Sequence, residues 1–229
     1  MSVQPDAPAL AGEIVRQVND LSERSTSAMR KIRRDFSRRL RKAPAKEVVA
    51  LAFALIGAPG VHRFIADELI VFHPTALGTL TENDIVRLAG ALSTWDEVDC
   101  FALYLSGRAW RAGQVRDETI AEWTQATDRW WRRAALVSTV ALNLKSQGGT
   151  GDPQRTLRIC RLLVRDRDDM VVKAMSWALR ALSVRDRAAV EAFLAEHQGQ
   201  LASRVIREVE NKLRTGLKNP SRALDRPRA

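Results

Sequence analysis

A carboxylate follows a tryptophan at helical spacing in the segment Thr94–Asp99, which reads Thr-Trp-Asp-Glu-Val-Asp. Trp95 and Asp99 are four residues apart, and on a helix this spacing puts both side chains on one face. Asp96 and Glu97 suit the first turn of such a helix, where the helix dipole favours acidic groups. Asp99 lies beyond that turn, in an apolar stretch. A carboxylate beside an aromatic ring suits chemistry on a cationic sugar or base. The alternative interpretation is a core tryptophan and a carboxylate paired with a nearby arginine.

Two further clusters combine tryptophan with basic residues. The first reads Trp130-Trp131-Arg132-Arg133. Adjacent residues on a helix point about 100° apart, so only one tryptophan and one arginine can share a face. The alternative is a helix start whose arginines extend along the surface into solvent.

The second cluster, Lys173, Trp177 and Arg180, forms a stripe at spacings of four and three residues. It lies next to an apolar face, so it places a large ring among charges. Such a ring suits stacking or contact with an alkyl cation. A partly buried tryptophan between solvated charges would give the same pattern.

The charge balance points to a polyanionic partner. The 229 residues include 37 basic and 27 acidic ones, which gives a net charge of +10. Such a charge attracts nucleic acid or an anionic membrane surface. Basic residues concentrate in residues 30–42 and again from residue 204 to the end of the chain. One such run is more often a solvated face than a binding site, but two runs favour contacts with phosphates and a steep salt dependence.

Other chemical classes find little support. Cys100 and Cys160 lie in apolar helical patterns, which predicts buried free thiols. The three histidines, His62, His73 and His197, lack the spacing of metal ligands, so neither a metal nor a cofactor is expected. No secretory signal or membrane span is apparent. We therefore expect a cytoplasmic protein that does not bind a membrane.

The hydrophobic period is helical nearly everywhere, which predicts an all-α fold of about a dozen helices. The antiparallel helix pairs are about 30–40 residues long, which favours HEAT-like repeats stacked into a curved α-α superhelix. Residues 1–216 are predicted to form a single domain, and residues 217–229 a flexible basic tail. Gly148–Gly151 is predicted to be the most flexible internal loop. The predicted helices span roughly residues 8–23, 26–42, 45–57, 61–71, 82–91, 94–107, 116–127, 129–145, 153–166, 169–183, 186–197 and 200–215.

The order of these clusters resembles the AlkD-type DNA alkylation repair glycosylases. The resemblance covers roughly residues 53–213 and is strongest from Trp95 to Arg180. It implies HEAT-like repeats around a basic concave cleft, and excision of cationic N3- and N7-alkylated purines from duplex DNA. No cofactor is implied. Since an alkylated purine is already a cationic leaving group, no general acid is needed to protonate it.

The resemblance also implies roles for individual residues. Asp99 would be the catalytic carboxylate, and Trp95 and Trp177 would flank the damaged nucleotide. The cleft arginine that contacts phosphate would be Arg133, with Arg132 as the alternative. Further basic positions of the cleft would be Lys173 and Arg180.

The N-terminal part departs from the family pattern. The aromatic-Gly-hydrophobic turn is not visible there, and the only tyrosine is Tyr104. Two other functions therefore stay open: a helical-repeat module that binds DNA or RNA without chemistry, and a protein-interaction scaffold of the HEAT or armadillo kind. No coiled-coil heptads are apparent, so we expect a monomer.

Overall fold

The computed structural model describes residues 6–90 and 92–220, and every regular element in these ranges is helical. This confirms the predicted all-α class. The chain divides into two compact units between Val115 and Arg116. Residues 6–90 and 92–220 include no helix that combines the length and the apolar content of a membrane span.

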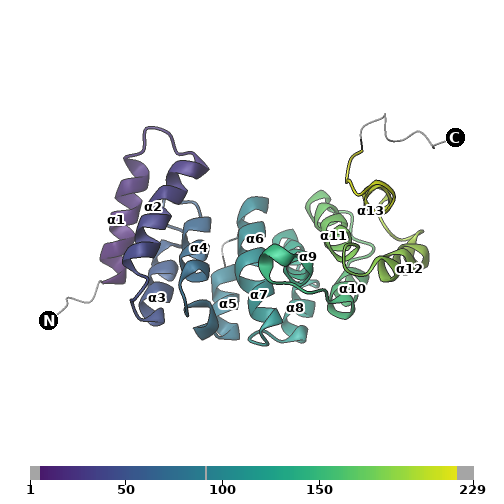
Figure 1. Ribbon diagram of the computed structural model, residues 1–229, viewed down its shortest axis with the longest axis horizontal. Coiled ribbons are helices and arrows are strands. Elements are labelled where there is room, and N and C mark those ends of the chain that lie inside the picture. Colours follow the sequence, from purple (N-terminus) through teal and green to yellow (C-terminus); the bar gives the residue numbers. More distant parts are fainter. Residues whose placement is uncertain (1–5, 91, 221–229) are drawn as a thin grey trace. The chain divides into compact units, whose positions relative to one another are not determined.

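The first unit consists of helices joined by short loops (Figure 1). Its α-helices pack mainly against near neighbours along the chain, with α3 lying on α1 and α4, and α2 on α4. The elements are α1 (Ala7–Asn19), α2 (Thr26–Arg39), α3 (Ala45–Leu55), α4 (Phe64–Phe72), a 3-10 turn (Leu77–Thr79), α5 (Glu82–Ala89), α6 (Trp95–Phe101), a π-helical segment (Ala102–Ser106) and α7 (Gly107–Arg111).

Local sequence explains where these helices begin and end. The Ser25 hydroxyl accepts a hydrogen bond from the backbone N–H of Ala28 and caps α2. Thr81 and Asp84 form a reciprocal capping box at the start of α5. After α3 the chain turns through Gly57, whose φ of 78° lies in the left-handed region that only glycine adopts without strain. Large apolar side chains then fill the space between the helices: Ile14, Phe36, Leu51, Leu55, Ile65, Leu69, Ile85, Phe101 and Trp110.

Two acidic residues on α4 lie inside this core. Glu68 is buried and receives charge-assisted hydrogen bonds from Arg30 Nε at 2.9 Å and Arg33 Nε at 2.7 Å. Asp67 is fully buried next to Arg63, whose Nε lies 3.5 Å from Asp67 Oδ2. Neither carboxyl oxygen of Asp67 has a hydrogen-bond partner among the residues described here. Burial raises the pKa of Asp67 to about 7, although the Arg63 guanidinium acts in the opposite direction.

The raised pKa of Asp67 predicts a pH-dependent stability. An unfolded aspartate ionises near pH 3.9, so between about pH 4 and 7 the native state binds more protons. The free energy of unfolding should therefore fall as the pH rises through this window. The side chain of Asp67→Asn cannot ionise, so this variant should not lose stability in this way. As the pH rises from 4.5 to 8, we expect its free energy of unfolding to increase relative to that of the wild type by on the order of 1–3 kcal/mol. Urea unfolding at both pH values measures this difference, and parallel pH profiles would contradict it.

The second unit repeats one pattern of helix initiation. Four of its helices begin after an aspartate whose carboxylate accepts a backbone N–H of the first turn: Asp128, Asp152, Asp168 and Asp186. The central helices are buried along most of their length, with α9 lying on α10 and α11, and α11 on α13. The elements are α8 (Asp117–Trp123), α9 (Arg129–Asn143), a 3-10 turn (Lys145–Gln147), α10 (Pro153–Leu162), α11 (Asp169–Leu182), α12 (Arg187–His197) and α13 (Ser203–Thr215).

Several local features bear on the sequence-based expectations. The helix predicted over residues 94–107 contains a π-helical segment, and the last helix begins at Ser203 rather than at residue 200. The Gly148–Gly151 loop is held by backbone hydrogen bonds, from Gly149 N–H to Leu144 O and from Gly151 N–H to Leu142 O. In the predicted tail, Lys218 Nζ lies 3.4 Å from Glu208 Oε2. Residues 221–229 of that tail lie outside the described residues.

Candidate nucleic-acid interface

Helix α6 presents Trp95 and Asp99 on one side. Trp95 is the first residue of the helix, and its side chain is 55% exposed. Asp99 follows one turn later and is partly exposed. Val98 and Phe101, on the other side of α6, are fully buried. The helix is therefore fixed to the core through its apolar face, and this leaves the aromatic ring and the carboxylate on the face toward solvent.

The other acidic residues of α6 hold the start of the helix. Asp96 Oδ2 lies 2.7 Å from His62 Nε2. The Glu97 carboxylate accepts hydrogen bonds from the backbone N–H and the hydroxyl of Ser93, both at 3.0 Å. Burial acts to raise the pKa of Asp96, but hydrogen bonds from His62 and Thr94 outweigh it and lower that pKa. These contacts give Asp96 and Glu97 a structural role at the start of α6.

The residues after Asp99 are partly or fully buried, and the helix becomes irregular there. Cys100 is next in the chain, and burial together with the Asp67 and Glu68 carboxylates raises its thiol pKa to about 12. That thiol stays protonated at neutral pH and is a poor nucleophile. The π-helical segment Ala102–Ser106 follows directly, and such segments are frequent near functional sites. The protonated Cys100 thiol is not suited to nucleophilic chemistry at neutral pH.

Helix α11 carries the second aromatic cluster. Trp177 is partly exposed, and Lys173 and Arg180 lie one turn before and after it. Lys173 Nζ lies 2.6 Å from Asp169 Oδ2 on the same helix. Arg180 Nε donates to the Ser176 hydroxyl at 3.1 Å, and that hydroxyl donates to the buried Glu208 carboxylate at 2.6 Å. The predicted stripe is therefore present, and both cations are partly exposed beside the ring.

Hydrogen bonds orient Arg180. Burial lowers the pKa of this guanidinium, and the Glu208 carboxylate acts in the opposite direction. An arginine pKa remains far above neutral after such a shift, so the side chain keeps its charge. The chain of contacts from Glu208 through Ser176 thus holds a cation next to Trp177.

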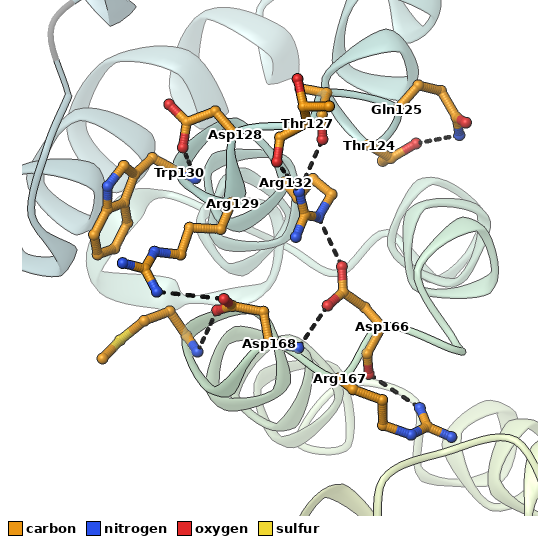
Figure 2. A network of polar contacts seen from close by, with 12 residues as sticks. Thr124, Gln125, Thr127, Asp128, Arg129, Trp130, Arg132, Asp166, Arg167 and Asp168 are labelled. Atoms are coloured by element: carbon orange, nitrogen blue, oxygen red, sulfur yellow. Dashed lines mark hydrogen bonds and ion pairs between the residues drawn. The ribbon is translucent and has the colours of Figure 1, made fainter.

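The arginines at the start of α9 have protein partners (Figure 2). Arg132 Nε donates to Asp166 Oδ2 at 2.7 Å, and its Nη1 donates to the carbonyls of Ala126 and Thr127. The same Asp166 accepts the backbone N–H of Asp168 through its other oxygen. This network ties the start of α9 to the segment that leads into α11.

The tryptophans and the remaining arginine of this cluster also make internal contacts. The Arg129 guanidinium lies 5.0 Å from the centre of the Trp130 ring, and Trp131 packs edge-on against Trp123. Arg133 is 5% exposed, and its Nη1 donates to the carbonyl of Met170 at 2.6 Å. A phosphate would have to compete with that carbonyl for the Arg133 guanidinium.

The predicted site residues thus fall into groups that the structure brings together within each unit. Trp95 and Asp99 share α6 in the first unit. In the second unit Lys173, Trp177 and Arg180 share α11, while Arg132 and Arg133 bind the segment before α11 and its first turn. Among the described residues, no group of three or more histidine, cysteine or acidic side chains is arranged to hold a metal ion.

Sequence reasoning missed the contacts that cross between helices. His62 bonds to Asp96 over 34 positions, and the buried Asp67 influences Cys100 from α4. No spacing rule links such pairs, because their proximity depends on how the helices pack. The one available signal was the presence of acidic residues within the strongly apolar run of α4.

Comparison with known proteins gives one match. A family model described as DNA alkylation repair enzyme matches residues 24–213, which is most of the chain. The search of curated proteins found no match, and neither did the search of solved structures. The matched range contains α6, α9 and α11 in full.

Proposed function

Because the chain belongs to the DNA alkylation repair enzyme family, we propose that it is a DNA glycosylase that hydrolyses the N-glycosidic bond of N3- and N7-alkylated purines in duplex DNA. The observation that carries this proposal is the arrangement on α6, where an exposed tryptophan and a carboxylate share one face. Family membership supports a role in DNA repair, and the α6 geometry supports the choice of reaction.

The chemistry requires few groups. In an alkylated purine the base is already cationic, so the bond from C1′ to the base nitrogen breaks with its electron pair passing to the base. The base leaves neutral, and the sugar gains oxocarbenium character. The Asp99 carboxylate stabilises that charge, accepts a proton from the attacking water and returns it to solvent, while the water oxygen bonds to C1′.

The aromatic and basic residues would bind the substrate. We assign Trp95 and Trp177 to contacts with the DNA, where a ring face attracts a cationic base or sugar. Lys173 and Arg180 are the phosphate contacts we favour, because both are partly exposed. Arg132 and Arg133 are engaged by protein carbonyls and Asp166, so we assign them to fixing α9 against the start of α11. The protein is proposed to act as a monomer.

Release of free base tests the proposal. Duplex DNA treated with a methylating agent is incubated with the full chain, and the supernatant is analysed for 7-methylguanine and 3-methyladenine. We expect time-dependent release of at least one of them, and none from unmodified duplex. Salt-sensitive binding of the duplex without release of any base would overturn the enzyme assignment. It would favour the alternative of a DNA-binding protein without catalysis.

A further inference from the structure

The basic run of residues 30–42 divides into arginines with structural roles and arginines with none. Arg33 binds the buried Glu68, and Arg39 binds Glu13 through two hydrogen bonds. Arg34 and Arg41 are exposed, and no acidic side chain in the described part of the chain pairs with either. The excess positive charge therefore concentrates at the positions that the fold does not use.

These two arginines border a groove that also contains an aromatic ring. The α2 groove has a volume of about 450 Å³, and its lining includes Arg33, Arg34, Arg38, Arg41, Phe72 and Pro74. Phe72, the last residue of α4, is 55% exposed, which is unusual for phenylalanine in a protein with ample core. The Arg33 guanidinium lies 4.4 Å from the centre of the Phe72 ring. Glu68 fixes this guanidinium, so the ring lies against a rigid cation.

A polar atom in the groove also lacks an internal partner. The hydroxyl oxygen of Ser37 is shielded from solvent and has no hydrogen-bond partner among the residues that the structure describes. A shielded hydroxyl without a partner costs free energy. The flat ring and the guanidinium groups without an acidic partner match two parts of a nucleotide, the base and the phosphate.

We propose that the α2 groove binds an unpaired nucleotide of a single-stranded nucleic-acid segment. The base stacks on Phe72, and the adjacent phosphates bind Arg34 and Arg41. Aromatic stacking combined with cationic contacts is the general mode of single-strand recognition, and base stacking needs an unpaired base. An acidic protein segment would satisfy the charges, but its carboxylates would leave the exposed face of Phe72 uncovered. None of the residues that line this groove belongs to α6 or α11, so the groove extends the proposed function to a second contact with nucleic acid.

Fluorescence anisotropy with a labelled oligothymidine of about 15 nucleotides tests the groove. Phe72→Ala leaves the net charge unchanged, and we expect it to raise the Kd for the single strand about tenfold. The same variant should change the Kd for a duplex of equal length by less than threefold. Phe72→Leu preserves apolar packing and should weaken single-strand binding similarly, which covers the case in which Phe72→Ala does not fold. Equal losses on single strand and duplex, or no loss in either variant, would overturn the assignment.

A charge-matched pair of variants tests the phosphate contacts. Arg34→Ala/Arg41→Ala should raise the Kd at least tenfold and lower the slope of log K against log salt by about 1.4, or about 0.7 for each lost phosphate contact on a single strand. Lys31→Ala/Lys46→Ala removes the same charge from exposed positions outside the groove and should change the Kd less than threefold. Equal effects of the two pairs would show that net charge alone drives binding and would overturn the site.

The Kd for the oligothymidine tests the α2 groove independently of the proposed glycosylase activity, because binding of an undamaged single strand requires no excision. A protein that releases no base can still show the Phe72 effect. Conversely, a protein that excises alkylated bases but ignores Phe72 substitution would retain the proposed function and lose the groove. Groove-dependent binding to an acidic peptide without binding to the oligothymidine would also overturn the nucleotide assignment.

Discussion

Asp99→Asn should lower the rate of base release from methylated duplex by about 10²–10³-fold, the loss seen when one preorganised electrostatic group of an active site is removed. Asparagine keeps the size and shape of the side chain, but it neither carries the negative charge that stabilises an oxocarbenium-like sugar nor accepts the proton of the attacking water. Single-turnover release of free base, with the protein in excess over the duplex, isolates this chemical step from product release.

The binding contribution can be separated from the chemical one. Removing a negative charge near DNA should leave the affinity for duplex unchanged or increase it, so a slower rate cannot result from weaker binding. Asp96→Asn is the matched control, because it makes the same change three residues earlier, where the carboxylate holds His62. We expect that control to retain release within a few-fold. A folded Asp99→Asn protein that releases base at the wild-type rate would rule out Asp99 as the catalytic group.

Gly149→Ala should destabilise the second unit by about 3 kcal/mol, the upper end of the usual cost of overpacking. A Cβ atom at this position would lie 2.5 Å from the backbone carbonyl oxygens of Ala141 and Leu142. Contacts with backbone cannot be relieved by a change of rotamer, so α9 or the loop must shift. The loop is further held by Arg185, whose Nη2 donates to the Gly149 carbonyl at 2.8 Å. A shift there would also disturb the contact with Arg185.

Urea unfolding of the full chain measures this effect. Gly199→Ala is the control, since a Cβ there would meet no atom within 4 Å. We expect the control to change the free energy of unfolding by less than about 0.5 kcal/mol, as for ordinary surface substitutions. Coincident unfolding curves for Gly149→Ala and Gly199→Ala would show that the loop adapts to a methyl group, as the sequence-based prediction of a flexible loop implies.

The sequence alone determined the features that depend on neighbours along the chain. Helical periodicity gave the all-α class and the approximate positions of the helices. Spacings of three and four residues placed Trp95 with Asp99, and Lys173 with Trp177 and Arg180, because the geometry of a helix fixes which residues share a face. The resemblance to alkylation repair enzymes is confirmed by the family match over residues 24–213.

Tertiary structure decided which charged groups the fold itself uses. Arg132 binds Asp166, and Arg33 binds Glu68, across more than thirty residues in each case. The sequence shows two basic clusters but not the carboxylates that neutralise them, because these lie on neighbouring helices or loops and their approach depends on packing. Gly149 illustrates the same limit. The glycine-rich sequence of its loop suggests a flexible loop, whereas the backbone of α9 lies so close to Gly149 that only glycine fits there. Spacing along a helix is a local property, but the partner of a buried charge is set by the contacts between helices.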